Sequence, residues 1–160
     1  MTWIRKHKKY SRPRKAYDKV RIEEENELVK NYGLKNKREI WKAEAAVDKI
    51  RRQAKQLITK SQEEQKIFFD KLNKIGLKVD KIADVLALKK EDWLKRRLQS
   101  ILIEKQLAKT PKEARQFIVH KHVAILGNIV NVPSYVVGRD EEKNISLVKL
   151  NKLKQEVKNG

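Results

Sequence analysis

Unbalanced positive charge is the property that most limits how this chain can fold. Its 160 residues carry 40 lysines and arginines against 21 aspartates and glutamates, so the formal net charge is +19. Such an excess repels itself in a compact state and destabilises a single tight core. The charge therefore indicates a polyanionic partner, of which nucleic acid is the commonest.

The lack of cysteine excludes several classes of protein. Without thiols the chain forms no disulfide, no thiolate zinc site and no cysteine nucleophile. No apolar run approaches the roughly 18 residues of a membrane span, and residues 1–15 lack the apolar stretch of a signal peptide. We expect a cytoplasmic protein of one or two small domains, with no membrane partner, no cofactor, no metal and no small-molecule substrate.

Residues 1–20 are expected to form a basic N-terminal extension. Eight bases stand there against one acid, Asp18. Such an arm is a solvated tail in the free protein and orders on RNA, because phosphate contacts release condensed counterions. Trp3, Tyr10 and Tyr17 interleave the charges and either stack on bases or pack locally. The candidate RNA-binding residues of the arm are Arg5, Lys6, Lys8, Lys9, Arg12, Arg14 and Lys15.

Residues 21–93 are predicted to form a small all-helical domain. Its clearest helix carries apolar residues three or four positions apart from Ile40 to Leu57, which is a helical stripe. The opposite face carries bases and no acid, and since a solvated face normally mixes both signs, this favours phosphate contact. The bases of that face are Arg38, Lys42, Lys49, Arg52 and Lys60.

Two further helices of this domain are predicted to end at glycines. One covers residues 22–31 and ends at Gly33, and the other covers residues 62–74 and ends at Gly76. Besides the apolar stripe, the expected core residues are Trp41, Ile67, Phe68, Phe69, Leu72, Ile75, Ile82, Val85, Leu86 and Leu88.

A second domain is expected over residues 94–142. Its first helix turns Leu94, Leu98, Ile101 and Leu102 inward and leaves Arg96 and Arg97 outward or along the rim. A second, short helix begins with the capping box Thr110-Pro111-Lys112-Glu113. It turns Ala114, Phe117 and Ile118 inward and Lys112, Arg115 and Gln116 outward, and it ends near His120.

Strands are predicted after the second helix. Residues 123–130 are expected to form a hairpin, and residues 133–137 a further strand that begins at a proline. The tail, residues 143–160, has only a weak helical signal from Leu147, Leu150 and Leu153. The predicted fold class is α+β and mainly helical.

Four stretches of the second domain carry a family resemblance. They read Arg96-Arg97-Leu98-Gln99, Thr110-Pro111-x-x-Ala114-Arg115-Gln116, His120-x-His122-Val123 and Pro133-Ser134-Tyr135. Together they closely resemble the S-four RNA-binding domain, also called the alpha-L motif. Upstream, Tyr32-Gly33-Leu34-Lys35-Asn36-Lys37-Arg38-Glu39-Ile40-Trp41 and Arg51-Arg52-Gln53-Ala54 resemble the small-subunit ribosomal protein four family of archaeal and eukaryotic type.

The resemblance, which covers about residues 20–142, implies a ribosomal function. A member of this family binds the folded five-way junction in the 5′ domain of small-subunit rRNA, nucleates assembly and lies near the mRNA entry path beside ribosomal protein five. The residues that match RNA-facing positions of the S-four motif are Arg96, Arg97, Thr110, Arg115, Gln116, His120 and His122. The basic faces add Lys112 and Lys121.

The chain departs from the usual motif at three loop positions. Gln106 stands where a glycine commonly precedes the Leu-Ala pair, and Lys121 where a glycine separates the two histidines. Leu126 replaces the asparagine of a hairpin Asn-Gly turn. Because leucine disfavours the positive φ of a primed turn, we expect the turn to shift to Gly127-Asn128.

Other functions are weaker candidates. His120 and His122 have no third ligand of matching spacing, so a metal site is disfavoured. The chain has no nucleophile arrangement and no glycine-rich phosphate loop, so it is not expected to be an enzyme. The alternatives that remain are a non-ribosomal S-four-domain RNA-binding protein and a basic DNA-binding protein, although the spread of basic surface fits structured RNA better than one major groove.

Overall fold

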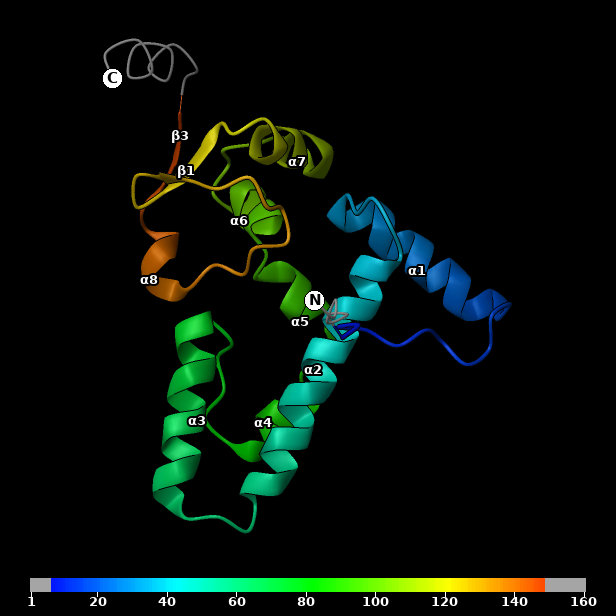
Figure 1. Ribbon diagram of the computed structural model, residues 1–160, viewed down its shortest axis with the longest axis vertical. Helices are drawn as coiled ribbons and strands as arrows, with labels where there is room; N and C mark the ends of the chain where they lie inside the picture. The colour runs from blue at the N-terminus through cyan, green and yellow to red at the C-terminus, as the bar shows by residue number, and fades with distance from the viewer. Residues whose placement is uncertain (1–6, 149–160) are drawn as a thin grey trace, which may run out of the picture.

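The computed structural model describes residues 7–148. This part of the chain is mainly helical with one small antiparallel sheet, which confirms the predicted α+β class (Figure 1). The elements in chain order are α1 (Lys19–Tyr32), α2 (Arg38–Leu57), α3 (Gln62–Ile75), α4 (Ile82–Ala87), α5 (Lys90–Lys95), α6 (Leu98–Glu104), α7 (Pro111–Val119), β1 (Val123–Ile125), β2 (Asn128–Ile129), α8 (Arg139–Glu142) and β3 (Ile145–Leu147).

The first part of the chain is built around α2. Helix α3 runs back alongside α2 (Figure 1), and Val85 of α4 packs into the hydrophobic core that the two helices share. The predicted stripe is confirmed, because Ile40, Ala43, Val47, Ile50 and Ala54 are all buried. Each fully buried isoleucine contributes about 1.5–3 kcal/mol of hydrophobic stabilisation.

Helix ends follow the local signals in the sequence. Gly33 and Gly76 both adopt the left-handed conformation, with φ of 58° and 90°, and end α1 and α3 as predicted. The core prediction for α3 holds for Leu72, which is buried, but it is wrong for Ile67, which is 55% exposed. Ile67 borders an open hollow of about 380 Å³ between α2 and α3, lined also by Gln53, so its side chain stays in contact with solvent.

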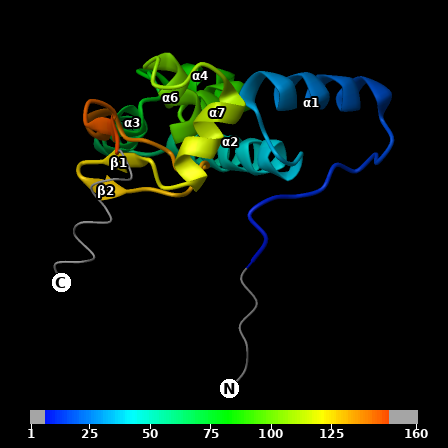
Figure 2. The same ribbon diagram turned by 90° about the horizontal axis from the view of Figure 1, so that it is seen from above.

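The second part packs α6 and α7 against β1. Its core consists of Leu98, Ile101, Leu102, Ala108, Ala114, Ile118, Val123, Ile125 and Val137. Helix α7 begins at Pro111, and the side chain of Thr110 accepts a hydrogen bond from the Glu113 amide at 3.2 Å, so the predicted start is confirmed. The small sheet and α1 lie on opposite sides of the molecule in both views (Figure 1 and Figure 2).

The sheet differs from the sequence prediction. Its order is β2-β1-β3, and all pairs are antiparallel. The predicted strand over residues 133–137 is wrong: Val136 makes only an isolated bridge to Arg97, and Pro133 has no amide hydrogen to donate. The third strand is β3, which lies in the predicted tail and contains Leu147.

The hairpin turn lies at Leu126-Gly127, the position that the usual motif gives to Asn-Gly. Ile125 pairs with Asn128, so the two-residue loop is Leu126-Gly127, with φ of 51° and 82°. The expectation of a turn at Gly127-Asn128 is therefore wrong. The sheet register holds the primed turn, because moving the loop by one residue would turn the side chains of β2 over.

The two parts of the chain join at Arg96 and Arg97, between α5 and α6. The single helix predicted here is broken, since Arg97 is extended with φ −76° and ψ 144°. The Leu98 amide donates to the Tyr135 carbonyl at 2.8 Å, and the Val137 amide donates to the Arg96 carbonyl at 3.1 Å. Backbone pairing across this break replaces helical hydrogen bonds. No helix in the described part combines the length and apolar character that a membrane span needs.

Candidate nucleic-acid interface

The predicted basic face of α2 lies open. Arg38, Lys42, Lys49 and Arg52 are all exposed, and within residues 7–148 none of them forms an ion pair. Lys60, beyond the end of the helix, is also exposed, and its Nζ forms an ion pair with Oε2 of Glu64 at 3.4 Å. In this part of the chain the face therefore presents four bases with no acid holding them, which suits contact with phosphates.

A second basic surface lies along α7 and just beyond it. Lys112, Gln116, His120 and Lys121 are exposed, as is the cap residue Thr110. His122 is half-buried, with its ring edge-on to Phe117 at a centroid distance of 6.2 Å. The rings of His120 and His122 lie 6.4 Å apart. These side chains combine cations with hydrogen-bond donors and acceptors.

Arg97 does not join this surface, so the prediction that it points outward or along the rim is wrong. It is only 5% exposed, and its Nη2 donates to Oε2 of Glu39 at the start of α2. Glu39 also accepts from Nη2 of Arg115 on α7 through Oε1 at 3.0 Å. A largely buried carboxylate that would otherwise be unpaired attracts both guanidinium groups. Arg115 is consequently half-buried instead of fully outward.

Arg96 is also used inside the protein instead of pointing outward. Its Nε donates to the carbonyl of Ile75 at 2.9 Å, and its Nη2 donates to the carbonyl of Val137 and to Oε2 of Glu142, at 3.0 and 2.8 Å. Arg96 thus joins the end of α3 to α8. The adjacent arginines at this break thus each bond to the first part of the chain, Arg96 to Ile75 and Arg97 to Glu39.

Gln99 completes the contact on the Arg97 side. It is 1% exposed, and its Nε2 donates to the carbonyls of Tyr32, Gly33 and Pro111 at 3.1, 3.1 and 2.7 Å. These carbonyls belong to the end of α1 and the start of α7. Gln99 thus joins the end of α1 to the start of α7, and the Glu39–Arg115 pair places the first turn of α2 next to α7, so the two basic surfaces adjoin each other.

The N-terminal segment reaches the same place. Tyr10 packs against Trp41 of α2 at a centroid distance of 6.0 Å, whereas Tyr17 is 95% exposed. Arg21 donates to the carbonyls of Lys15 and Ala16 at 2.9 and 3.0 Å. The arm bases Lys8, Lys9, Arg12, Arg14 and Lys15 are exposed. The candidates Arg5 and Lys6, with Trp3, Leu150 and Leu153, lie outside the described residues.

Two largely buried carboxylates stabilise this region. Burial raises the pKa of Glu39, but the hydrogen bonds and charges of Arg115 and Arg97 outweigh it and hold that pKa below its ordinary value. Burial likewise raises the pKa of Glu25, and hydrogen bonds from Trp41, Arg21 and Lys37 outweigh it and lower that pKa. Both groups therefore stay ionised and cancel positive charge inside the protein.

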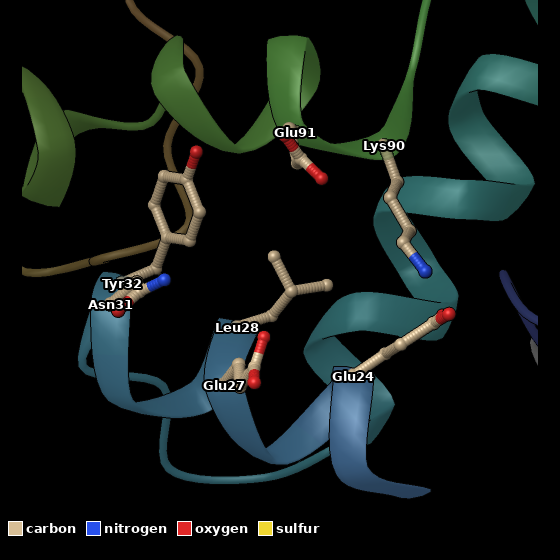
Figure 3. A pocket seen from close by; sticks show the side chains of 7 residues that line it. All are labelled: Glu24, Glu27, Leu28, Asn31, Tyr32, Lys90 and Glu91. Carbon is tan, nitrogen blue, oxygen red and sulfur yellow. The ribbon is translucent and has the colours of Figure 1, made fainter. Parts of the chain in front are cut away.

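Acidic side chains predominate in one hollow of the protein. A hollow of about 470 Å³ lies between α1 and α5, and its lining holds Glu24, Glu27 and Glu91 against one base, Lys90 (Figure 3). Such a lining repels phosphate, so the hollow does not belong to a nucleic-acid interface. Among the described residues no three His, Asp or Glu side chains gather as metal ligands would.

Sequence reasoning missed Glu39 and Gln99. Both lie within the stretches that carry the family resemblance, but nothing local assigns them partners, because Glu39 and Arg97 are 58 positions apart. The available signal is a polar residue beside an apolar position in each case: Glu39 precedes buried Ile40, and Gln99 follows buried Leu98.

Comparisons with known proteins show what this chain is similar to. Residues 96–143 match the family model described as S4 domain. The chain is similar to the protein named small ribosomal subunit protein uS4 in three organisms. It is 46% identical to that of Methanococcus aeolicus over 146 residues, covering 87% of this chain and 82% of the relative. For Methanosphaerula palustris the identity is 43% with 87% and 83% covered, and for Nanoarchaeum equitans 43% with 90% and 84% covered.

Proposed function

The chain belongs to the small ribosomal subunit protein uS4 family, and we propose that it binds the folded junction in the 5′ domain of small-subunit rRNA. It is a ribosomal protein and not an enzyme. Within the proposal, it nucleates assembly of the small subunit in the cytoplasm. It then stays near the mRNA entry path, beside ribosomal protein five.

One observation carries the proposal: three basic surfaces meet at the first turns of α2. The α2 face begins there with Arg38, the α7 surface adjoins through the Glu39–Arg115 pair at 3.0 Å, and the arm adjoins through Tyr10 and Trp41. A surface of this width fits several helices of a folded RNA, which present phosphates and 2′-hydroxyls more readily than base edges.

The proposed contact residues are the exposed candidates together with half-buried His122. They are Arg38, Lys42, Lys49, Arg52, Thr110, Lys112, Gln116, His120, Lys121 and His122, with Lys8, Lys9, Arg12, Arg14 and Lys15 of the arm. Arg115 is half-buried and reaches RNA only by sharing its guanidinium with Glu39. Arg96 and Arg97 are left out because their side chains bond within the protein.

The proposed domain boundaries are those expected from the sequence, with one change. Residues 21–93 are the helical domain and residues 94–142 the S4 domain, which we extend to residue 147 because β3 pairs with β1.

The test is binding of the purified chain to a transcript of the 5′ domain in about 0.3 M salt, with excess tRNA and duplex DNA. At this salt, weak nonspecific phosphate contacts are suppressed. Binding that resists both competitors, with protection at the junction, supports the proposal. Binding that tRNA abolishes would leave a general RNA-binding protein, and binding that duplex DNA abolishes would indicate a DNA partner.

A further inference from the structure

The link between the two parts of the chain carries an inference that rests on the proposed function. The basic surface of α2 and that of α7 belong to separate hydrophobic cores, one between α2, α3 and α4, the other between α6, α7 and β1. Two binding surfaces on one chain act together only when their relative orientation fits both sites on the partner. What fixes that orientation therefore affects RNA affinity.

The ion pairs of Glu39 join the two parts of the chain and so restrict their relative orientation. The carboxylate is mostly buried and holds two arginines: Arg97 donates to Oε2, and Arg115 donates to Oε1 at 3.0 Å and to Oε2 at 3.4 Å. Both arginines come from the S4 part, while Glu39 comes from α2. A carboxylate that binds two planar guanidinium groups restricts the rotation of the joined helices relative to each other as well as the distance between them.

Arg97 has no other hydrogen-bond acceptor among the described residues that could replace Glu39. Nε and Nη1 of Arg97 are buried and have no hydrogen-bond partner among the described residues, so Glu39 is the acceptor on which this guanidinium depends. Arg115 Nη1 also donates to Oε1 of Gln99 at 3.4 Å, and Gln99 Nε2 in turn donates to carbonyls at the end of α1 and at the start of α7. Loss of the carboxylate leaves two guanidinium groups without their shared acceptor.

We propose that Glu39 is a positioning residue for RNA binding, which holds the α2 and α7 surfaces in the one orientation that fits the rRNA. It acts without touching RNA, since a carboxylate repels phosphate. The expected effect is therefore opposite in sign to that of simple electrostatics. Removing an acid from a cationic RNA-binding protein should tighten binding, whereas removing this acid should weaken it.

The first measurement reports orientation without RNA. Because the chain has no cysteine, spin labels attach only at introduced ones, here Lys55→Cys on α2 and Val119→Cys on α7. Glu39→Gln should broaden the distance distribution between the labels. Arg115→Gln, which keeps the Arg97–Glu39 pair, is the milder second variant and should broaden it less.

The second measurement is affinity for the 5′-domain transcript, at a temperature where circular dichroism shows every variant folded. Glu39→Gln should lower affinity by about tenfold or more, since the gain from joined sites is of the order of 10²–10⁴. Glu44→Gln, an exposed acid on the same helix, removes the same charge and should leave affinity equal or higher.

Unchanged distances, or an affinity that Glu39→Gln leaves unchanged or raises, would each overturn the proposal. If the unsubstituted chain does not bind the transcript, the proposed function fails instead, and the distance measurement alone decides whether Glu39 fixes the orientation.

Discussion

The guanidinium group of Arg96 occupies the space that a side chain on Gly76 would fill. A Cβ atom at residue 76 would lie 2.5 Å from Cζ of Arg96, and the arginine is held there by the carbonyls of Ile75 and Val137 and by Glu142. Gly76 also has φ of +90°. The glycine thus serves both the end of α3 and the attachment of α8 to it.

Gly76→Ala should therefore destabilise the protein by about 2 kcal/mol, through backbone strain and displacement of Arg96. Gly127→Ala is the matched control, because Gly127 has φ of +82° but, apart from its two chain neighbours, no described residue has an atom within 4 Å of its Cβ position. Backbone strain alone should destabilise this variant by about 1 kcal/mol. Urea unfolding of both variants gives the difference between their unfolding free energies. Equal destabilisation would show that the Arg96 side chain moves aside without a cost in stability.

The three positions that depart from the motif all keep the backbone that glycine or asparagine favours. Gln106, Lys121 and Leu126 have φ of 57°, 63° and 51°, and they are the non-glycine residues with positive φ among residues 7–148. The surrounding hydrogen bonds impose this conformation, as the Leu107 amide does by donating to the Leu102 carbonyl at 2.9 Å.

Gln106→Gly should consequently stabilise the fold by about 0.5 kcal/mol, since relief of strain exceeds the entropy that glycine loses on folding. Lys105→Gly, at the neighbouring position with φ of −82°, should destabilise it by a similar amount. Thermal unfolding distinguishes the two. A lower melting temperature for Gln106→Gly would mean that the glutamine side chain compensates its strain.

Acid should destabilise the protein partly through Glu25. Its pKa in the folded protein is lowered from 4.5, so its contribution to stability is complete above that value and is lost as the pH falls through the folded pKa. Glu25→Gln should flatten the fall in unfolding free energy below pH 4.5, while exposed Glu44→Gln should follow the original curve. Parallel curves for Glu25→Gln and the original would contradict the lowered pKa.

Deletion of residues 1–15 should weaken RNA binding and leave cooperative unfolding intact. The bases removed from the described part of the arm are exposed, and this part contributes to packing mainly through Tyr10, which lies against Trp41. The salt dependence of affinity should become shallower by about 0.7–0.9 for each phosphate that the arm no longer neutralises. Disappearance of the thermal transition would show instead that the arm belongs to the core.

Elements with local signals could be predicted from the sequence. The stripe beginning at Ile40 predicted α2, and Thr110 with Pro111 predicted the first turn of α7, because periodicity and capping involve residues close in the chain. Gly33 and Gly76 marked helix ends for the same reason.

Features that depend on distant partners could not be predicted. Arg97 reads as a surface base until Glu39 is brought beside it, and β3 becomes a strand only because β1 offers it an edge. The exposed candidates, such as Lys112 and Lys121, were predictable because no acid within residues 7–148 pairs with them. The candidate RNA surface was thus largely predictable, whereas the contacts that orient its two halves were not.

The most direct test of the proposed RNA surface is cleavage of the 5′-domain transcript by iron-EDTA tethered to single introduced cysteines. Gln116→Cys on α7 and Arg52→Cys on α2 place the probe on the basic surfaces, and Glu27→Cys places it in the acidic hollow. We expect strong cleavage at the junction from positions 116 and 52 and little from position 27. Cleavage that is strongest from position 27 would contradict the proposed RNA surface.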